Sequence, residues 1–284
     1  LPLGVLLLKS GSPTTWVSLW ISPEALRALS GTALSSFGAS LVALAFGLPF
    51  AWLVARSNIA GVRALQTVVT LPSAIPPYIW TMGWIALANP KSGWLTLVIG
   101  KGHLDVYGLG GIAFVLGTSA LPLVVLSTSA ALKRIDPSLE EAARLSGASA
   151  AKTFLSVTLP LITPAAMSGA ALVFVFASAS FGVPYLLGVS ANPPTPTLTT
   201  RIYSEVLMGE TGLSRAAVLS VELLLLAVFA LFGRLWGASA ASVALAAEAF
   251  VPVWLGVAVA MVGTALAVVF PSYAVLCVAA LCMG

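Results

Sequence analysis

Long apolar stretches alternate with short polar stretches along most of this chain. A helix needs about 20 mostly apolar residues to cross a bilayer. Runs of about that length cover residues 32–55, 65–88, 109–132, 161–187 and 214–236, with a further apolar run at 249–284. The pattern predicts an all-α polytopic membrane protein with about five to seven transmembrane helices in this chain.

The composition supports the same class. Charged residues make up 8% of the 284 residues, whereas soluble domains carry about 25%. A fold in water could not cover its surface with so few charges, so the lipid bilayer is the first partner that the sequence implies. The net charge of +4 is modest and gives no case for binding nucleic acid.

Two of the predicted spans contain breaks. Within residues 65–88 the prolines lack the N–H that continues a helix, and carbonyls freed in lipid need partners in protein or in a water-filled path. The residues of this break are Pro72, Pro76, Pro77 and Tyr78. We expect them to shape a gate on a translocation path; a packing kink without substrate contact is the alternative.

A second break follows residue 181, at Gly182-Val183-Pro184. Beside it lie Ser178, Ser180 and Phe181. These side chains are candidates to line the same path, although serines in membrane helices also serve helix packing.

Glu222 is an acid well inside the predicted span 214–236. Intramembrane acids are expensive, so they are functional candidates by default. Glu222 could line the path of a cationic substrate, or it could pack against a neighbouring helix or reach water.

The sequence gives no support for an enzyme. It shows no metal cluster, nucleophile–base pair or acid pair of the kind that builds a catalytic site. It also lacks the G-x-x-x-x-G-K-[ST] loop that binds ATP phosphates. We therefore expect no catalytic residue, metal or cofactor, and an energy source on a separate chain.

Residues 133–160 form a charged loop between two predicted spans. Asp136-Pro137 suits a helix start with proline in the first turn, and Ser138 with Glu141 alternatively fits a capping box. The helix that follows is made of small residues, which let another surface approach its backbone. We interpret the loop as a docking surface for a soluble partner.

The same loop carries a specific motif. Glu141-Ala142-Ala143 is followed after three residues by Gly147, and after nine more by Val157-Thr158-Leu159-Pro160. This resembles the signature, or EAA motif, of permease subunits of binding-protein-dependent ABC importers, E-A-A, three residues, G, nine residues, I-x-L-P; only Val157 departs from it.

The resemblance implies the transmembrane-domain fold of type I ABC importers, with this loop as the coupling helix in a groove of a cytoplasmic ATPase. The coupling residues it implies are Glu140, Glu141, Ala142, Ala143, Gly147, Leu159 and Pro160. Whether Glu141 contacts the partner or caps its own helix stays open at this point.

The resemblance also implies partners and a location. It implies two cytoplasmic ABC ATPase subunits, an extracytoplasmic substrate-binding protein, and a second permease half or a second copy, in a multi-pass protein of the cell inner (plasma) membrane. Residues 71–80, 164–188 and 198–206 resemble the branch that transports ferric iron, thiamine and polyamines, with ferric iron slightly favoured.

An ion-gradient-driven secondary transporter is the competing hypothesis. Such transporters also use broken helices and sites near the midplane. They need coupling acids inside the bundle, and Glu222 is the one candidate that we identify for that role.

The sequence suggests two parts. Residues 1–236 form the expected permease domain with its coupling loop 133–160. Phe270-Pro271 followed by apolar residues resembles Leu1-Pro2 followed by apolar residues. We therefore expect residues 237–284 to be a linker and the first helix of a second half in a fused permease, although apolar-Pro-apolar runs are common in membrane segments.

Overall fold

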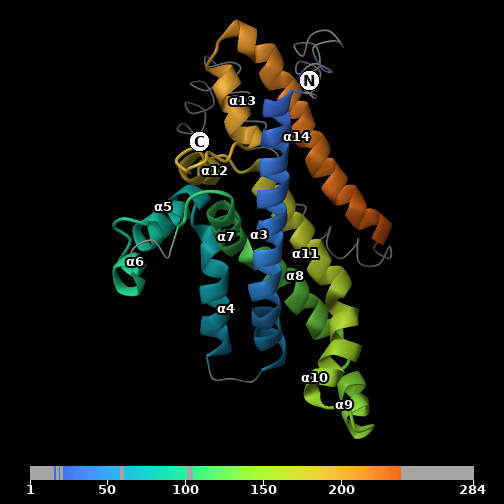
Figure 1. Ribbon diagram of the computed structural model, residues 1–284. Helices are drawn as coiled ribbons and strands as arrows, with labels where there is room; N and C mark the ends of the chain where they lie inside the picture. The colour runs from blue at the N-terminus through green and yellow to red at the C-terminus, as the bar shows by residue number, and fades with distance from the viewer. Residues whose placement is uncertain (1–15, 17–18, 20–21, 58–60, 101–104, 238–284) are drawn as a thin grey trace, which may run out of the picture.

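The computed structural model describes residues 16, 19, 22–57, 61–100 and 105–237, and this part of the chain is helical, with no strand in it (Figure 1). The expected linker and second-half helix at 238–284 lie outside the described residues, as do residues 1–8. Before the charged loop, the described helices are α3 (Pro23–Arg56), α4 (Val62–Thr70), the 3₁₀ turn η1 (Leu71–Ala74), α5 (Pro77–Ala88), α6 (Trp94–Ile99), α7 (Leu109–Ser119) and α8 (Leu121–Arg134). From the charged loop onward, the described helices are α9 (Pro137–Leu145), α10 (Ala150–Thr153), the π-helical segment η2 (Phe154–Thr158), α11 (Leu159–Ala179), α12 (Gly182–Gly188), α13 (Leu198–Val206) and α14 (Glu210–Gly237).

Helix α3 runs through the centre of the molecule, and α7, α8 and α11 pack around it (Figure 1). Its buried face is made largely of alanine, serine and glycine, which allows neighbouring backbones to come close. In lipid, such small residues drive helix association because apolar area alone gives no preference for a protein neighbour. At Gly47 a β-carbon would lie 2.8 Å from a methyl group of Val124 on α8.

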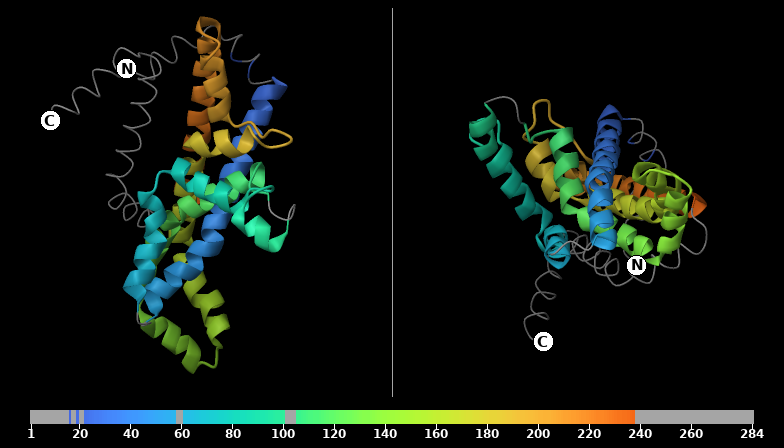
Figure 2. Two further views of the ribbon diagram at one scale, coloured as in Figure 1. Left: turned by 90° about the vertical axis from the view of Figure 1, so that its left-hand side faces the viewer. Right: turned by 90° about the horizontal axis from the view of Figure 1, so that it is seen from below.

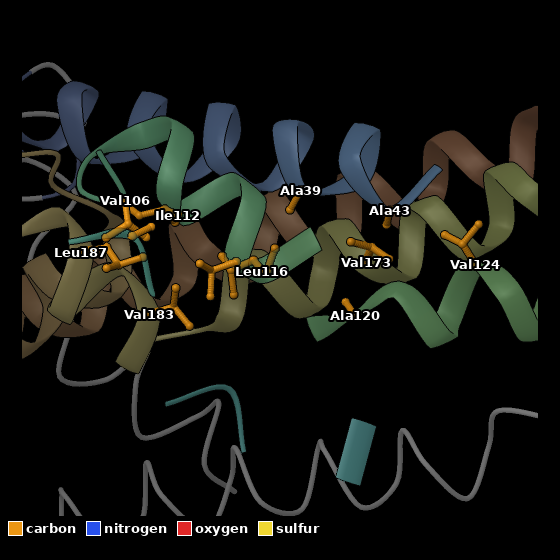
Figure 3. Packing of buried hydrophobic residues seen from close by; sticks show 13 residues of the cluster. Ala39, Ala43, Val106, Ile112, Leu116, Ala120, Val124, Val173, Val183 and Leu187 are labelled. Atoms are coloured by element: carbon orange, nitrogen blue, oxygen red, sulfur yellow. The ribbon is translucent and has the colours of Figure 1, made fainter. Parts of the chain in front are cut away.

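The main apolar core lies where α3, α7, α8, α11 and α12 meet. Figure 3 shows Ala39 and Ala43 of α3 turned toward Val173 of α11. The larger fully buried side chains of this cluster are Ile112, Val115, Leu116, Val124, Val173, Val183 and Leu187. One polar contact joins two of these helices, because the Ser40 hydroxyl donates to the Ala170 carbonyl at 3.0 Å.

Three helices of the described residues are long and apolar enough to cross a membrane: Pro23–Arg56, Ala150–Ala179 and Gly212–Leu231. A fourth span is possible if Leu109–Ser119 and Leu121–Arg134 form one span with a 47° bend. Pro122 explains the bend, because it has no N–H for the carbonyl of the preceding turn. The expected all-helical membrane fold is confirmed.

Besides the bent span 109–132, two further predicted spans differ in detail from the structure. Residues 65–88 are not one helix: the prolines divide them into α4, η1 and α5. The span expected at 161–187 ends as α11 at Ala179, and α12 follows after the break. A continuous helix would need an N–H at residue 184 for the Ser180 carbonyl, but residue 184 is proline. The Thr199 hydroxyl donates to that carbonyl instead, at 2.9 Å.

Candidate docking helix and translocation path

The docking loop begins with a defined helix start. Asp136 is the N-cap of α9, and its carboxylate accepts a hydrogen bond from the Ser138 N–H at 2.9 Å. Pro137 occupies the first helical position, where a missing N–H costs nothing. Ser138 therefore lies inside the helix, and the alternative capping box with Glu141 is not formed. The exposed Glu141 is left for a role other than capping.

Hydrogen bonds from Ser138 lower the pKa of the Asp136 carboxyl; the bond from the backbone N–H has the larger effect and the bond from the side chain the smaller. A lowered folded pKa means that the ionised carboxylate stabilises the helix start. This contribution is complete above the ordinary pKa of 3.8 and is lost as the pH falls through the lower folded value.

Replacing Asp136 by alanine is expected to loosen the first turn of α9. Alanine has no side-chain acceptor for the Ser138 N–H. Amide hydrogen exchange measured by mass spectrometry at neutral pH should become faster at residues 138–141. Asp136→Asn is the matched control and should retain slow exchange, because asparagine is an equally good N-cap. Equal exchange in the alanine variant and the unmodified chain would contradict the capping role.

The end of α9 explains the glycine of the motif. Gly147 has φ +84°, a left-handed conformation that glycine adopts without a steric penalty. The Gly147 N–H donates to Arg144 O at 2.9 Å, and the Ala148 N–H donates to Ala143 O at 3.1 Å. These two bonds form a Schellman motif, which satisfies the last carbonyls of the helix. Gly147 therefore ends the helix at a fixed length.

The surface of α9 is open. None of its residues is buried, and α9 and α10 lie at the end of the molecule opposite α13 (Figures 1 and 2). Leu145 is 89% exposed and Leu139 is 48% exposed, beside the exposed charges of Glu141 and Arg144. Apolar and charged side chains that protrude from a short helix suit contact with another protein.

The coupling residues expected from the motif differ in their surroundings. Glu141, Ala142 and Gly147 are exposed, and Ala143 is half-buried. Glu140 instead turns toward its own chain, as described below. Leu159 packs against a second buried cluster that contains Leu132 and Ile162; Pro160 stands exposed in the first turn of α11.

The structure brings the two breaks together. The Tyr78 ring lies against Gly182, where a β-carbon would be 3.3 Å from a Tyr78 ring carbon. The break at 71–78 and the break after Phe181 are therefore neighbours in space although they are far apart in sequence. Pro72 is buried, Pro77 is half-buried and Pro76 is exposed.

Three aromatic rings gather beside this contact. Ring centroids of Phe181 and Tyr185 are 5.2 Å apart, those of Phe181 and Tyr203 are 5.1 Å apart, and those of the two tyrosines are 5.8 Å apart. All three rings are exposed, by 37% to 42%. Sequence reasoning missed Tyr185 and Tyr203, because only the docking of α13 against the break brings Tyr203 there.

The two serine candidates have different surroundings. Ser178 is buried, and its hydroxyl donates to the Val175 carbonyl of its own helix at 2.9 Å, which fits helix packing. Ser180 is half-buried at the break, where its backbone carbonyl accepts the hydrogen bond from the Thr199 hydroxyl.

Glu222 lies apart from the two breaks. It is on α14, which packs on α13, α11 and α3, and in Figure 1 this helix is on the opposite side of α3 from α5. Its side chain is half-buried, and within the described part of the chain its Oε2 has no hydrogen-bond partner.

A charged network that the sequence analysis did not single out fixes α13. Arg201 pairs with Glu24 at the start of α3 and with Glu205 Oε1 at 2.9 Å. The Glu205 side chain is only 1% exposed, so this pair is poorly screened by water. The Leu198 N–H also donates to the Thr32 hydroxyl at 2.8 Å. These contacts hold the helix that carries Tyr203 against the start of α3.

Solved structures share this architecture. A bacterial alginate ABC transporter, in complex with an alginate pentasaccharide-bound periplasmic protein, has a chain that matches with a TM-score of 0.59 and 22% identity, over 80% of this chain and 84% of that one. The MetNI methionine ABC transporter in an inward-facing conformation matches with a TM-score of 0.55 and 20% identity, over 79% and 95% of the two chains. The fold is therefore that of the membrane domains of ABC importers.

Sequence comparisons define the family. Residues 47–244 match the model of the "Binding-protein-dependent transport system inner membrane component" family, and the chain belongs to this family. It is 31% identical over 239 residues to a probable sulfate transport system permease protein of Nephroselmis olivacea, and this match covers 83% of each of the two chains. It is 29% identical over 199 residues to the molybdenum transport permease ModB of Escherichia coli K12, which covers 67% of this chain and 84% of that protein.

These findings decide several expectations. The chain is a multi-pass membrane protein and a permease subunit of an ABC importer, a transport component rather than an enzyme. The family predicted from the motif is confirmed. The iron, thiamine and polyamine branch is not supported, because the relatives named above are sulfate and molybdate permeases.

Proposed function

We propose that this chain forms the translocation path for a tetrahedral oxyanion, sulfate or molybdate, in an ATP-driven importer. The observation that carries the proposal is its similarity, at 29% to 31% identity over two thirds or more of the chain, to permeases named for these two anions. Ferric iron, the substrate expected from the sequence, has no comparable support.

The chemistry of the aromatic cluster is compatible with an anion. Tyr78, Tyr185 and Tyr203 are each 42% to 46% exposed, and a phenol O–H is a hydrogen-bond donor. Donors that are neutral can hold an oxyanion without trapping it by full ion pairing, which suits a path that must release its cargo. We infer that this face, formed by α5, α12 and α13, lines the path.

The exposed helix α9 supplies the coupling surface in this proposal. Two cytoplasmic ATPase subunits would bind the α9–α10 end, and a substrate-binding protein would deliver the anion at the α12–α13 end. The family description names an inner membrane component, which supports placing this chain in the inner membrane. A second membrane half completes the path. Membership of the family removes the reason to favour an ion-gradient-driven transporter.

Reconstituted uptake tests the proposal. The chain, its second half, the ATPase and the binding protein are placed in liposomes, and labelled sulfate and molybdate are offered with and without ATP inside. We expect uptake of one or both anions only with ATP, and competition between them. Uptake of ferric iron without uptake of either anion would overturn the substrate class, and uptake driven by an ion gradient without ATP would overturn the mechanism.

A further inference from the structure

An ion pair joins the docking helix to the end of α3. The Arg56 Nη2 atom lies 3.4 Å from Glu140 Oε1 and also donates to the Ile135 carbonyl at 3.1 Å. Arg56 is the last residue of α3, so one guanidinium group contacts both the segment before α9 and the first turns of α9. The side chains are only 14% and 19% exposed, which limits screening of the pair by water and salt.

A third segment joins the same carboxylate. The Thr158 hydroxyl donates to Glu140 Oε1 at 3.0 Å, and Thr158 is 2% exposed. Thr158 ends η2, the π-helical segment between α10 and α11. Single π-helical turns are rare in proteins, and those that do occur are often found at functional sites. Glu140 therefore contacts both α3 and the segment that leads into α11.

These contacts connect the docking end with two spans. Helices α10 and α11 run together through η2 as one apolar helix over Ala150–Ala179. Farther along these two helices from the docking end, the Ser40 hydroxyl of α3 donates a hydrogen bond to the Ala170 carbonyl of α11. A displacement of α10 passes directly into α11, whereas α9 has the Glu140–Arg56 contact as its polar connection to α3.

The adjacent acids of the motif face different ways. Glu141 is exposed and, among the described residues, no hydrogen bond or ion pair of its carboxylate is found. Glu140 is three-quarters or more covered and has both partners inside its own chain. One position is thus placed to contact a partner protein, and the other to hold the helix that makes the contact.

We propose that Glu140, with Arg56 and Thr158, is an internal joint that transmits movement of the docking helix to α3 and α11. Glu140 is a positioning residue, and it acts through the spans rather than by touching the ATPase or the transported anion. The proposal rests on the coupling role of α9 in the proposed function.

The ion pair of this joint is poorly exposed and so resists separation, yet one donor of the Arg56 guanidinium remains unused among the described residues. Removing one partner of a poorly exposed ion pair leaves the other charge without compensation, which is strongly unfavourable. Arg56 Nε is buried and, within the described part of the chain, has no hydrogen-bond partner. The guanidinium therefore keeps a free donor with which the carboxylate could re-pair when α9 moves relative to α3.

The test compares the joint with the exposed acid in the reconstituted full importer. Three quantities are measured: the amount of ATPase that co-purifies, the rate of ATP hydrolysis with the binding protein present, and the anion taken up per ATP hydrolysed. For Glu140→Gln and Arg56→Gln we expect normal co-purification and about a tenfold lower uptake per ATP. For Glu141→Gln we expect weaker co-purification instead. Lys133→Gln, at an exposed position of α8, is the matched charge control and should change neither.

The exchanged variant, Arg56→Glu with Glu140→Arg, separates a joint from a merely stabilising contact and covers the case in which a single variant does not fold. It should restore part of the uptake per ATP lost in the single variants, because it re-forms the ion pair but not the hydrogen bonds to the Ile135 carbonyl and from Thr158. The proposal is overturned if single variants couple normally, if Glu140→Gln loses the ATPase as Glu141→Gln does, or if the exchange restores folded protein without coupling. If the unmodified chain itself binds no ATPase, the proposed function fails, and that result is distinct from these.

Discussion

Replacing Leu145 by glutamate is expected to weaken binding of the ATPase about 100-fold, a loss of about 2.8 kcal/mol. Leu145 is 89% exposed at the last position of α9. An apolar side chain so placed gains stability only when a partner covers it, and a carboxylate in the same apolar contact would be desolvated without compensation. Co-purification of the ATPase with the tagged permease, followed by titration of the ATPase, measures the effect.

Leu207→Glu is the matched control. Leu207 is also highly exposed, at 69%, but it follows α13 at the opposite end of the molecule. The same change of chemistry there should leave ATPase binding intact. The L145E chain itself should fold normally, because the end of α9 is held by backbone bonds around Gly147. If L145E binds ATPase as well as the unmodified chain, α9 is not the docking element.

Replacing Gly169 by valine is expected to destabilise the chain by about 3 kcal/mol, the upper part of the range for overpacking. A β-carbon at Gly169 would lie 2.8 Å from Val124 Cα and 3.1 Å from the Leu123 carbonyl oxygen. Both atoms belong to the backbone of α8, so the clash cannot be relieved by a side-chain rotation. The two helices must separate at their crossing, and thermal unfolding in detergent should show a clearly lower Tm or no folded protein.

Gly83→Ala provides the control within the same chain. Gly83 is also inside a helix, α5, but in the part of the chain that the structure describes no atom lies within 4 Å of its added β-carbon, apart from its own neighbours and helix backbone. Alanine is favoured over glycine in a helix by roughly 0.5 to 1 kcal/mol, so this variant should be slightly more stable. A Gly169→Val chain as stable as the unmodified one would show that α8 and α11 do not cross as closely as described.

Much of the architecture follows from the sequence because lipid restricts the choices. A backbone in hydrocarbon must satisfy its own hydrogen bonds, so long apolar runs become helices. Prolines mark where they break, as at residues 72–77 and 184. The sequence did not predict the interruption at Ala120, although Pro122 is its visible cause. It did mark the break at residues 182–184 inside the span 161–187, but only the structure shows that α11 already ends at Ala179 and that α12 follows as a separate helix.

The candidate site was predicted unevenly. The proposed docking loop could be singled out from the sequence because its residues are consecutive and follow a fixed spacing, from Glu141 to Gly147 and Pro160. The aromatic cluster was found only in part, since Tyr203 joins Phe181 through the folding of α13 onto the break. The roles proposed for Glu140 and Glu141 could not be separated from the sequence either, because adjacent acids look alike until Arg56 is placed.

By itself the sequence determined that this protein lies in a membrane, where two of its spans break, and which loop carries the motif of its family. These properties depend on local composition and spacing, which the chain contains at each point. The structure decided between the two helix starts in favour of Asp136, showed that Gly147 ends the helix in a left-handed conformation, and brought Tyr78 against Gly182. It also decided that Glu140 is paired within the chain while Glu141 stays exposed. The two caps depend on local backbone geometry. The contacts of Tyr78 and Glu140 depend on which distant groups come within van der Waals or hydrogen-bonding distance, and only packing of the helices fixes those distances.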